Sequence, residues 1–130
     1  KSNKRTRRKR KIMNHQNGRK KLNMKSGHRK ALLRNQVIHF VTYGSLHTTK
    51  ARVKEVQRLA EKIVTVARTG YDFNTIRRVK QILPYNQDAV EKLIKEIAPR
   101  YLNRAGGYTR VISLGRRESD TAPVARLEWV

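Results

Sequence analysis

The sequence contains no cysteine, and its acidic residues are few, with 9 Asp and Glu against 32 Lys and Arg in 130 residues. The absence of cysteine excludes disulfides, thiolate zinc sites and cysteine nucleophiles. No uninterrupted apolar run approaches the roughly 18 residues of a membrane span, and no apolar core typical of a signal peptide occurs. We therefore expect no membrane partner, and a length that suits one domain with a modest core.

Positive charge is concentrated in the first part of the chain. The formal net charge is +23, which opposes compaction unless a polyanion neutralises it. The residues up to Lys54 include 18 basic side chains and no acidic one, whereas 14 basic and 9 acidic side chains follow from Glu55 onward. The sequence therefore predicts a polyanionic partner that meets one face or end of the folded domain as well as a tail.

Residues 1–25 are predicted to form an extended basic arm, and residues 26–130 a single domain. The arm contains KSNKRTRRKRK and GRKKLNMK, with too few apolar side chains to fold alone. Such runs contact nucleic-acid phosphates, but they also serve as nuclear localisation segments or solvating tails. Because the excess of basic residues continues into the domain, nucleic acid is the favoured partner.

Four helices are predicted from apolar residues that recur at steps of three and four. The expected helices are Arg29–Gly44, Thr49–Gly70, Thr75–Leu83 and Asp88–Ala98. Thr49 is expected to cap the second helix, because a threonine hydroxyl can accept a hydrogen bond from the first turn. Pro84 and Pro99 are expected to close the third and fourth helices.

Alternating apolar and polar residues predict two strands near the end of the chain, Tyr108–Leu114 and Val124–Val130. They pair most simply as an antiparallel hairpin across the turn-rich GRRESDTAP, and Ser45–Thr48 is a possible further strand. The predicted fold class is therefore α+β, with a basic N-terminal arm and about four helices packed on a small sheet that ends in an antiparallel hairpin.

The stretch KSGHRKALLRN places Arg29 and Lys30 at the start of the first helix, with Arg34 close behind. Helix N-termini carry unpaired N–H groups and the positive end of the macrodipole, so they usually attract Asp or Glu. A nucleic-acid phosphate would explain the reversal, because backbone N–H groups, these side chains and His28 could converge on one anion. The alternative is that the long side chains extend past the helix end into water.

The segment RAGGYTR is a second candidate site. Gly106 and Gly107 permit a positive φ and a close approach of the backbone. Arg104, Tyr108 and Arg110 offer phosphate contacts and a stacking face for a base. The alternative, equally open from the residues alone, is a tight entry into a strand with Tyr108 half buried.

Signatures of catalysis and metal binding are absent or weak. The four histidines match no standard metal spacing, and no phosphate-cradling GxxxxGK[ST] or GxGxxG run occurs. Glu118 and Asp120 follow Arg116 and Arg117, so a salt bridge within the loop is favoured over acid–base chemistry. We therefore expect no catalytic residue, no metal, no cofactor and no small-molecule substrate.

Three stretches, in the same order and at compatible spacings, resemble the bacterial-type large-subunit ribosomal protein seventeen family. They are GRKKLNMKSGHRKALLRN, LHTTKARVKEVQRLAEKIVTVAR and APRYLNRAGGYTRVISLGRRESDTAPVARLEWV. The resemblance covers about Met13 to Val130, and the block GGYTR followed by an RR, D and AP turn is specific to the family. One departure is Ser119, at a position where the family commonly has glycine.

The resemblance implies an α+β protein without a catalytic role, bound to large-subunit rRNA and next to other ribosomal proteins. The ribosome would belong to a bacterial cytoplasm or to an organelle, either a mitochondrion or a chloroplast. The arm would thread between RNA helices and become ordered on assembly. Matching positions imply RNA contacts at Gly18, Arg19, Lys20, Leu22, Ser26, His28, Arg29, Arg34, Lys50, Arg52, Gly107, Tyr108, Thr109 and Arg110. Positive charge alone adds Arg5, Arg7, Arg8, Arg10, Lys21, Lys25, Lys30, Arg104, Arg116 and Arg117.

Two other classes of protein stay open on the sequence. A DNA-binding architectural or regulatory protein would share the charge, but it would prefer duplex DNA to folded RNA and would not sediment with ribosomes. An RNA-modifying or RNA-cleaving enzyme would show turnover on RNA that is lost when His28 or Asp120 is replaced.

Overall fold

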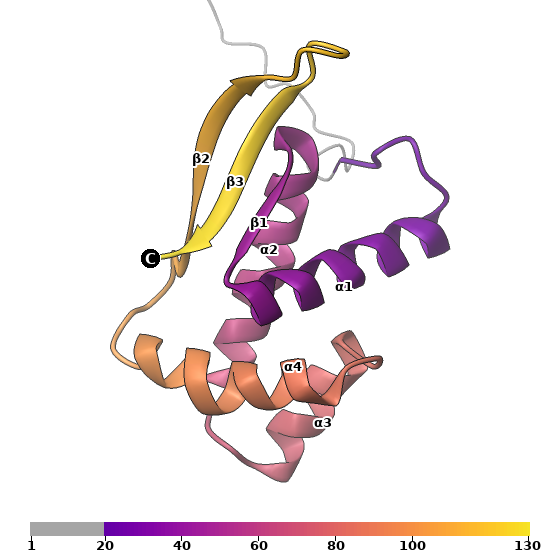
Figure 1. Cartoon of the computed structure of the whole chain (residues 1–130). Coiled ribbons are helices and arrows are strands. Elements are labelled where there is room, and N and C mark those ends of the chain that lie inside the picture. Colours follow the sequence, from indigo (N-terminus) through magenta and orange to yellow (C-terminus); the bar gives the residue numbers. More distant parts are fainter. Residues whose placement is uncertain (1–19) are drawn as a thin grey trace, which may run out of the picture.

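In a computed structural model, which describes residues 20–130, helices pack against one face of a three-stranded sheet (Figure 1). Along the chain the elements are α1 (Ser26–Tyr43), β1 (Ser45–Thr49), α2 (Lys50–Ala67), α3 (Phe73–Ile82), α4 (Gln87–Lys92), the π-helical turn η1 (Leu93–Ile97), the 3₁₀ turn η2 (Ala98–Tyr101), β2 (Thr109–Arg116) and β3 (Pro123–Trp129). The sheet is antiparallel, in the order β1-β3-β2. The predicted α+β class and the C-terminal hairpin are confirmed, and so is the possible strand Ser45–Thr48, which extends to Thr49.

The strand β3 is the centre of the sheet, and its residues alternate between a buried and an exposed face. Leu127 pairs with Leu46 on one side and with Val111 on the other. Leu46 and Leu127 are buried, whereas Arg126, the residue before Leu127, is exposed. One face of the sheet therefore belongs to the core and the other faces solvent, as is common in antiparallel sheets.

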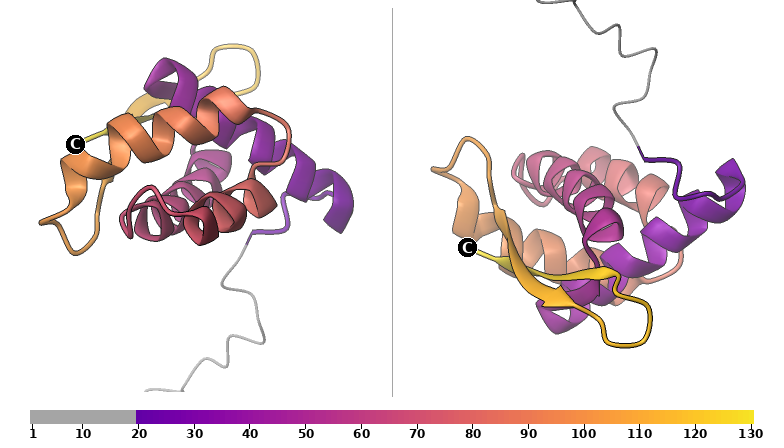
Figure 2. Two further views of the ribbon diagram at one scale, coloured as in Figure 1. Left: turned by 90° about the horizontal axis from the view of Figure 1, so that it is seen from below. Right: turned by 90° about the horizontal axis from the view of Figure 1, so that it is seen from above.

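Helix α2 lies at the middle of the core, with α1 crossing it on one side and the sheet on another. The buried residues of α2 recur at helical spacing and are Val53, Glu55, Val56, Ala60, Ile63, Val64 and Ala67. Phe40 of α1 stacks on Trp129 of β3, with ring centroids 4.2 Å apart. The buried residues of α1 all lie in its C-terminal half, and its N-terminal turns extend beyond the other helices (Figure 2).

Helices α3 and α4 begin two residues and one residue before their predicted starts, Thr75 and Asp88, because side-chain caps precede them. The carboxylate of Asp72 accepts a hydrogen bond from the Asn74 N–H at 3.2 Å, so α3 begins at Phe73. The side-chain oxygen of Asn86 accepts one from the Ala89 N–H at 2.9 Å, so α4 begins at Gln87. Asp and Asn are favoured at such positions because they satisfy N–H groups that have no partner within the helix.

Two predicted helix ends are wrong in detail. Thr49 precedes α2, but its side chain makes no capping hydrogen bond, because Thr49 ends β1 and pairs with Val124. Pro99 does not stop the helix that starts at Gln87, since the chain winds on through η1 and η2 to Tyr101. A proline is tolerated in the first turn of a helical segment, where its missing N–H costs no hydrogen bond.

Candidate nucleic-acid interface

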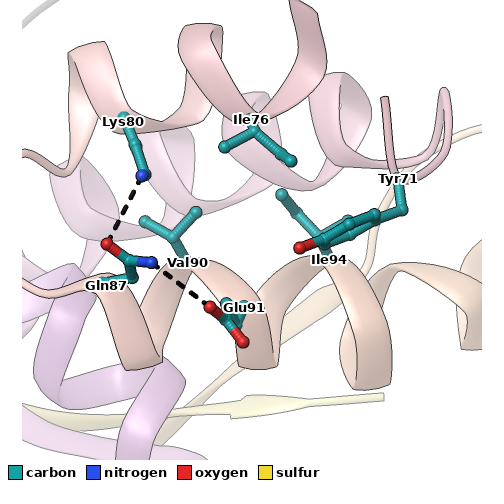
Figure 3. Close-up of a pocket in the computed structure, with 7 residues that line it drawn as sticks. All are labelled: Tyr71, Ile76, Lys80, Gln87, Val90, Glu91 and Ile94. Atoms are coloured by element: carbon teal, nitrogen blue, oxygen red, sulfur yellow. Dashed lines mark hydrogen bonds between the residues drawn. The ribbon is translucent and has the colours of Figure 1, made fainter. Parts of the chain in front are cut away.

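The described part of the chain offers little to a metal or a small substrate. Within residues 20–130 no group of three or more His, Cys, Asp or Glu residues is placed to hold a metal ion, and none of the helices in this range is long and apolar enough to cross a membrane. A cavity of about 110 Å³ lies between α3 and α4, where Lys80, Gln87 and Glu91 form a chain of hydrogen bonds (Figure 3). This volume is small against the roughly 300–1,000 Å³ of typical ligand pockets. A second hollow of about 300 Å³, beside Arg68 and Leu102, lies at the lower end of that range and is open to solvent.

The base of the predicted arm is fastened to the first turns of α2. The backbone N–H of Lys20 donates a 3.1 Å hydrogen bond to Oε1 of Glu55, and Arg58 lies 3.3 Å from the same oxygen. Glu55 is 8% exposed, so the first carboxylate in the sequence is turned into the protein and engaged there. The surface around this point therefore keeps its positive charge.

Basic residues from three segments meet at this end of the molecule. Thr49, which immediately precedes Lys50, pairs with Val124, and Val124 in turn pairs with Gly115. The start of α2 and the β2–β3 turn consequently lie at the same end of the sheet (Figure 1). We name this surface the basic end and define it as Lys20, Lys21, Lys50, Arg52, Lys54, Arg116 and Arg117, of which Arg52 is half-buried and the others are exposed.

The start of α1 has the reversed charge that its sequence predicts. Its first turn contains no acidic residue, and Lys25 before it makes no capping hydrogen bond through its side chain. At about 100° per residue, Ser26, Lys30 and Arg34 share one face of the helix, which we name the α1 face. His28 falls on the opposite side of the first turn from Lys30, so the convergence of His28 with these side chains on one anion stays a prediction.

Arg29 holds the segment before α1 in place. Its Nη1 donates to the carbonyl oxygens of Lys21 at 3.2 Å and Met24 at 3.4 Å. Between these carbonyls, Leu22 and Asn23 have φ of 55° and 52°, a region that residues with a Cβ seldom occupy without support. Arg29 therefore shapes the connection between the arm and α1, and Lys30 and Arg34 are the better candidates for contact with an anion.

The RAGGYTR segment divides into anchored and exposed residues. Tyr108 is 1% exposed, and its hydroxyl accepts a 2.7 Å hydrogen bond from Nη1 of Arg68. The interpretation of Tyr108 as a stacking face for a base is therefore wrong, because its ring is packed inside the protein. Thr109, also buried, donates to Glu61 at 3.0 Å. Exposed residues of this segment include Arg104, Gly107 and Arg110.

This loop and the basic end lie at opposite ends of the β2–β3 hairpin. Thr109 pairs with Trp129 next to the loop, whereas Arg116 pairs with Pro123 next to the basic end. An eight-residue strand such as β2 spans about 27 Å at roughly 3.4 Å per residue. The predicted site residues therefore form no single pocket but are spread over the basic end, the α1 face and the loop.

Three cations of the hairpin are engaged in ion pairs, and the longest of these joins Arg126 to Glu128 at 3.6 Å. Arg117 donates from Nε and Nη2 to the two carboxylate oxygens of Asp120, at 2.9 and 2.7 Å, which confirms the predicted loop salt bridge. These bonds, together with the backbone N–H of Ala122, lower the pKa of Asp120 to about 2. Arg110 lies 2.6 Å from Glu128 on the neighbouring strand.

Serine at position 119 is compatible with this turn. A family glycine is indispensable only where φ is positive. In the turn positive φ values occur at Gly115 and Thr121, and not at Ser119. The departure from the family pattern therefore does not strain the backbone.

The sequence analysis missed a row of exposed cations on α2. Lys54, Arg58 and Lys62 follow one another at steps of four, and all three are exposed. Residues four apart lie above one another on a helix, so the row extends the basic end along α2. Its sequence signal is the spacing itself, on the side opposite the apolar stripe.

Six predicted residues lie outside the described part of the chain and carry no structural test. They are Arg5, Arg7, Arg8, Arg10, Gly18 and Arg19. Lys25, Ser26 and Lys50 are exposed where the structure describes them, and Leu22 is half-buried.

Comparisons with known proteins agree with one another. The family model described as ribosomal protein L17 matches residues 32–130. A large ribosomal subunit protein bL17 from Thermoanaerobacter sp. is 43% identical over 115 residues, which cover 87% of this chain and 99% of the relative. The protein of the same name from Aliarcobacter butzleri is 42% identical over 118 residues, covering 91% of this chain and all of the relative. That of Bdellovibrio bacteriovorus is 45% identical over 111 residues, which span 60% of the relative.

The family model covers well over half of the chain, and the match to the first two relatives extends over nearly their whole length. The acid-free segment from Lys20 to Lys54 fits this assignment. The chain therefore belongs to the ribosomal protein L17 family, whose members are structural constituents of the ribosome and not enzymes.

Proposed function

We propose that this protein binds large-subunit rRNA of a bacterial-type ribosome through the basic end and the α1 face, with residues 1–25 as an arm between rRNA helices and residues 26–130 as the packed body. The observation that carries the proposal is the lack of acidic residues in the segment that supplies most of the cations of these two surfaces. From Lys20 to Lys54 there are nine basic and no acidic side chains, and Glu55, the next residue, is buried and paired.

Counterion release supplies the driving force for such binding. Each phosphate that Lys or Arg neutralises frees condensed cations, and about 6–10 such contacts lower the affinity by roughly 10³–10⁵ between 50 and 200 mM salt. Even without Lys20 and Lys21, which belong to the arm, the basic end and the α1 face provide seven cations, namely Lys30, Arg34, Lys50, Arg52, Lys54, Arg116 and Arg117. The role is structural, because binding and charge neutralisation hold RNA segments together and require no chemistry.

The names of the relatives support the place of binding. Each is described as a protein of the large ribosomal subunit, and the relatives compared are bacterial. A neighbouring ribosomal protein is the further partner that we propose, for surfaces that RNA leaves uncovered.

The test is sedimentation of tagged protein from gently lysed cells on a sucrose gradient, repeated after a high-salt wash. Wild-type protein is expected with the large subunit in both runs. The variant Lys30→Glu/Arg34→Glu, which reverses the α1 face, is expected at the top of the gradient. Its matched control, Lys95→Glu/Arg100→Glu, reverses two exposed cations elsewhere and is expected to sediment with the subunit.

Two results would contradict the proposal, in different ways. If the Lys30→Glu/Arg34→Glu variant still sediments with the large subunit after the high-salt wash, the α1 face does not contribute to RNA binding. Wild-type protein at the top of the gradient, or a peak that DNase removes, would overturn binding to the large subunit and favour a DNA-binding protein instead.

A further inference from the structure

Helix α3 presents a face that neither the core nor the predicted sites use. Phe73, its first residue, is 75% exposed, and Tyr85, just after its end, is 70% exposed. Between them Arg77 and Arg78 are exposed as well. Phe73 and Arg77 are one helical step of four apart, so they lie next to one another on the surface. Arg78 lies about 100° further round the helix, and Tyr85 follows the opposite end of α3 from Phe73, so the four residues span the exposed surface of α3. We name these four residues the α3 face.

The positive charge of this face is not compensated within the described residues. Neither Arg77 nor Arg78 makes a side-chain hydrogen bond or ion pair with any residue of the range 20–130. Two acidic residues of the segments around α3 have other contacts. Asp72 caps α3 by accepting from the Asn74 N–H, and Glu91 pairs with Lys95 at 3.1 Å.

The packing of α3 does not require the two aromatic rings. The helix is held by Thr75 and Val79, which are buried, and by Ile76, which is half-buried. The two rings are therefore free to contact a partner.

The combination of guanidinium groups and exposed rings selects the kind of partner. Unpaired RNA bases stack on Phe and Tyr rings, and phosphates of the same strand accept from arginine. A base-paired helix hides its base faces and would use the cations alone. A protein partner would instead need acidic side chains to pair with Arg77 and Arg78. In a ribosome, phosphate groups are the more abundant anions.

The α3 face is remote from the basic end. Lys20 and Glu55 join at the first turns of α2, whereas α3 follows the other end of that helix (Figure 1). The 18 residues of α2 are about 27 Å long at roughly 1.5 Å per residue. RNA bound at both places would therefore be tied together across the length of α2.

We infer that the α3 face binds a second rRNA segment with unpaired bases, whose phosphates contact Arg77 and Arg78 and whose bases stack on Phe73 and Tyr85. The inference rests on the proposed binding to large-subunit rRNA and adds a second contact to it. The protein would then link two rRNA segments rather than bind a single one.

The first test is photo-crosslinking within purified large subunits. Phe73→p-benzoylphenylalanine and Tyr85→p-benzoylphenylalanine are expected to form RNA adducts several times more often than the control Glu96→p-benzoylphenylalanine, an exposed position on η1. Adducts to protein only, no adducts, or equal RNA adducts at position 96 would overturn the inference. Because only sedimented subunits are irradiated, a loss of sedimentation counts against the proposed function and is scored separately.

The second test measures how much the rings of Phe73 and Tyr85 contribute to the affinity for rRNA. Phe73→Leu/Tyr85→Leu keeps apolar side chains but removes both stacking faces, and it is expected to bind deproteinised large-subunit rRNA about tenfold more weakly or worse. The control Tyr43→Leu removes another tyrosine, 71% exposed at the end of α1, and is expected to bind as the wild type does. Equal affinity of all three proteins would overturn the inference.

Discussion

Two regions that pack against α2 differ in how they balance charge. The acid-free region, residues 20–54, has nine basic side chains and no acidic one, whereas the mixed region, residues 71–101, has six basic and four acidic side chains. In the mixed region Lys95 lies 3.1 Å from Glu91, lowers the pKa of Glu91 and has its own pKa raised in return. The mixed region thus offsets part of its charge internally, and the acid-free region leaves that task to a polyanion.

The comparison shows that surface charge and folding are separate matters in this protein. Both regions contribute buried residues to one core, such as Phe40 of α1 and Leu93 of η1. Exposed pairs such as Lys95 and Glu91 contribute little to stability, so the mixed region is not held together by its salt bridges. What distinguishes the regions is how much of their positive charge is left for a partner to neutralise.

The largest expected effect is on the free energy of unfolding, when the buried side chain that packs α1 of the acid-free region against the sheet is removed. Phe40 is fully buried and stacks on Trp129, so Phe40→Ala should lower the free energy of unfolding by about 3–5 kcal/mol. Denaturant unfolding measures this loss. Tyr43→Ala, at an exposed position of the same helix, should change it by less than about 0.5 kcal/mol. Similar losses for the two variants would mean that α1 does not depend on this contact.

A smaller effect is expected where the arm meets the body. Glu55→Gln keeps an acceptor for the Lys20 N–H but removes the charge that strengthens this bond and the contact with Arg58. We expect a loss of about 1–2 kcal/mol in the free energy of unfolding and faster hydrogen exchange at the Lys20 amide. Glu96→Gln, on an exposed carboxylate, is the control and should change neither. Unaltered exchange at Lys20 in Glu55→Gln would count against the fastening of the arm.

The comparison between the two regions is sharpened by the salt dependence of rRNA binding. Each lost phosphate contact lowers the slope of log affinity against log salt by about 0.7–0.9. Lys54→Gln/Lys62→Gln on α2 should therefore reduce the slope by about 1.4–1.8. Lys95→Gln/Arg100→Gln in the mixed region should leave it unchanged. Equal slopes for the two variants would show that the α2 row is not a phosphate contact.

The smallest effect concerns the β2–β3 turn. The pair with Arg117 lowers the pKa of Asp120 from its ordinary 3.8 to about 2, so Asp120 favours the folded state above pH 3.8 and this contribution disappears as the pH falls through about 2. Titration of Asp120 followed by NMR should give the low pKa. In Arg117→Gln the pKa should rise toward the ordinary value, and an unchanged pKa would assign the shift to the Ala122 N–H instead. Because both side chains are about half exposed, little change in stability is expected.

Much of the fold can be predicted from the sequence because the apolar residues keep a clear period. The period of three and four along α2 and the alternation in β3 both reappear as buried faces. The exact starts of α3 and α4 depend on single hydrogen bonds that the side chains of Asp72 and Asn86 accept from backbone N–H groups. The apolar period does not encode these bonds. The apolar period therefore predicts that a helix or strand is present, whereas single side chains determine at which residue it begins.

The candidate site was only partly predictable for a different reason. Net charge identified the basic end, but burial depends on contacts between distant parts of the chain. Tyr108 packs in the core beside Tyr101, and its hydroxyl accepts a hydrogen bond from Arg68, 40 residues earlier. No local pattern around RAGGYTR indicates these contacts. The α2 row and the α3 face were visible as spacings of cations, yet only the fold shows that these faces are not needed by the core.

The most direct test of the account is acylation of lysines, compared between free protein and purified large subunits and read by mass spectrometry. Lys20, Lys21, Lys30, Lys50 and Lys54, all exposed in the acid-free region, are predicted to react in the free protein and to be protected in the subunit. Lys95, exposed in the mixed region, is predicted to stay reactive in both. Protection of Lys95 together with continued reactivity of Lys50 and Lys54 would contradict the claim that the acid-free region is the surface that rRNA covers.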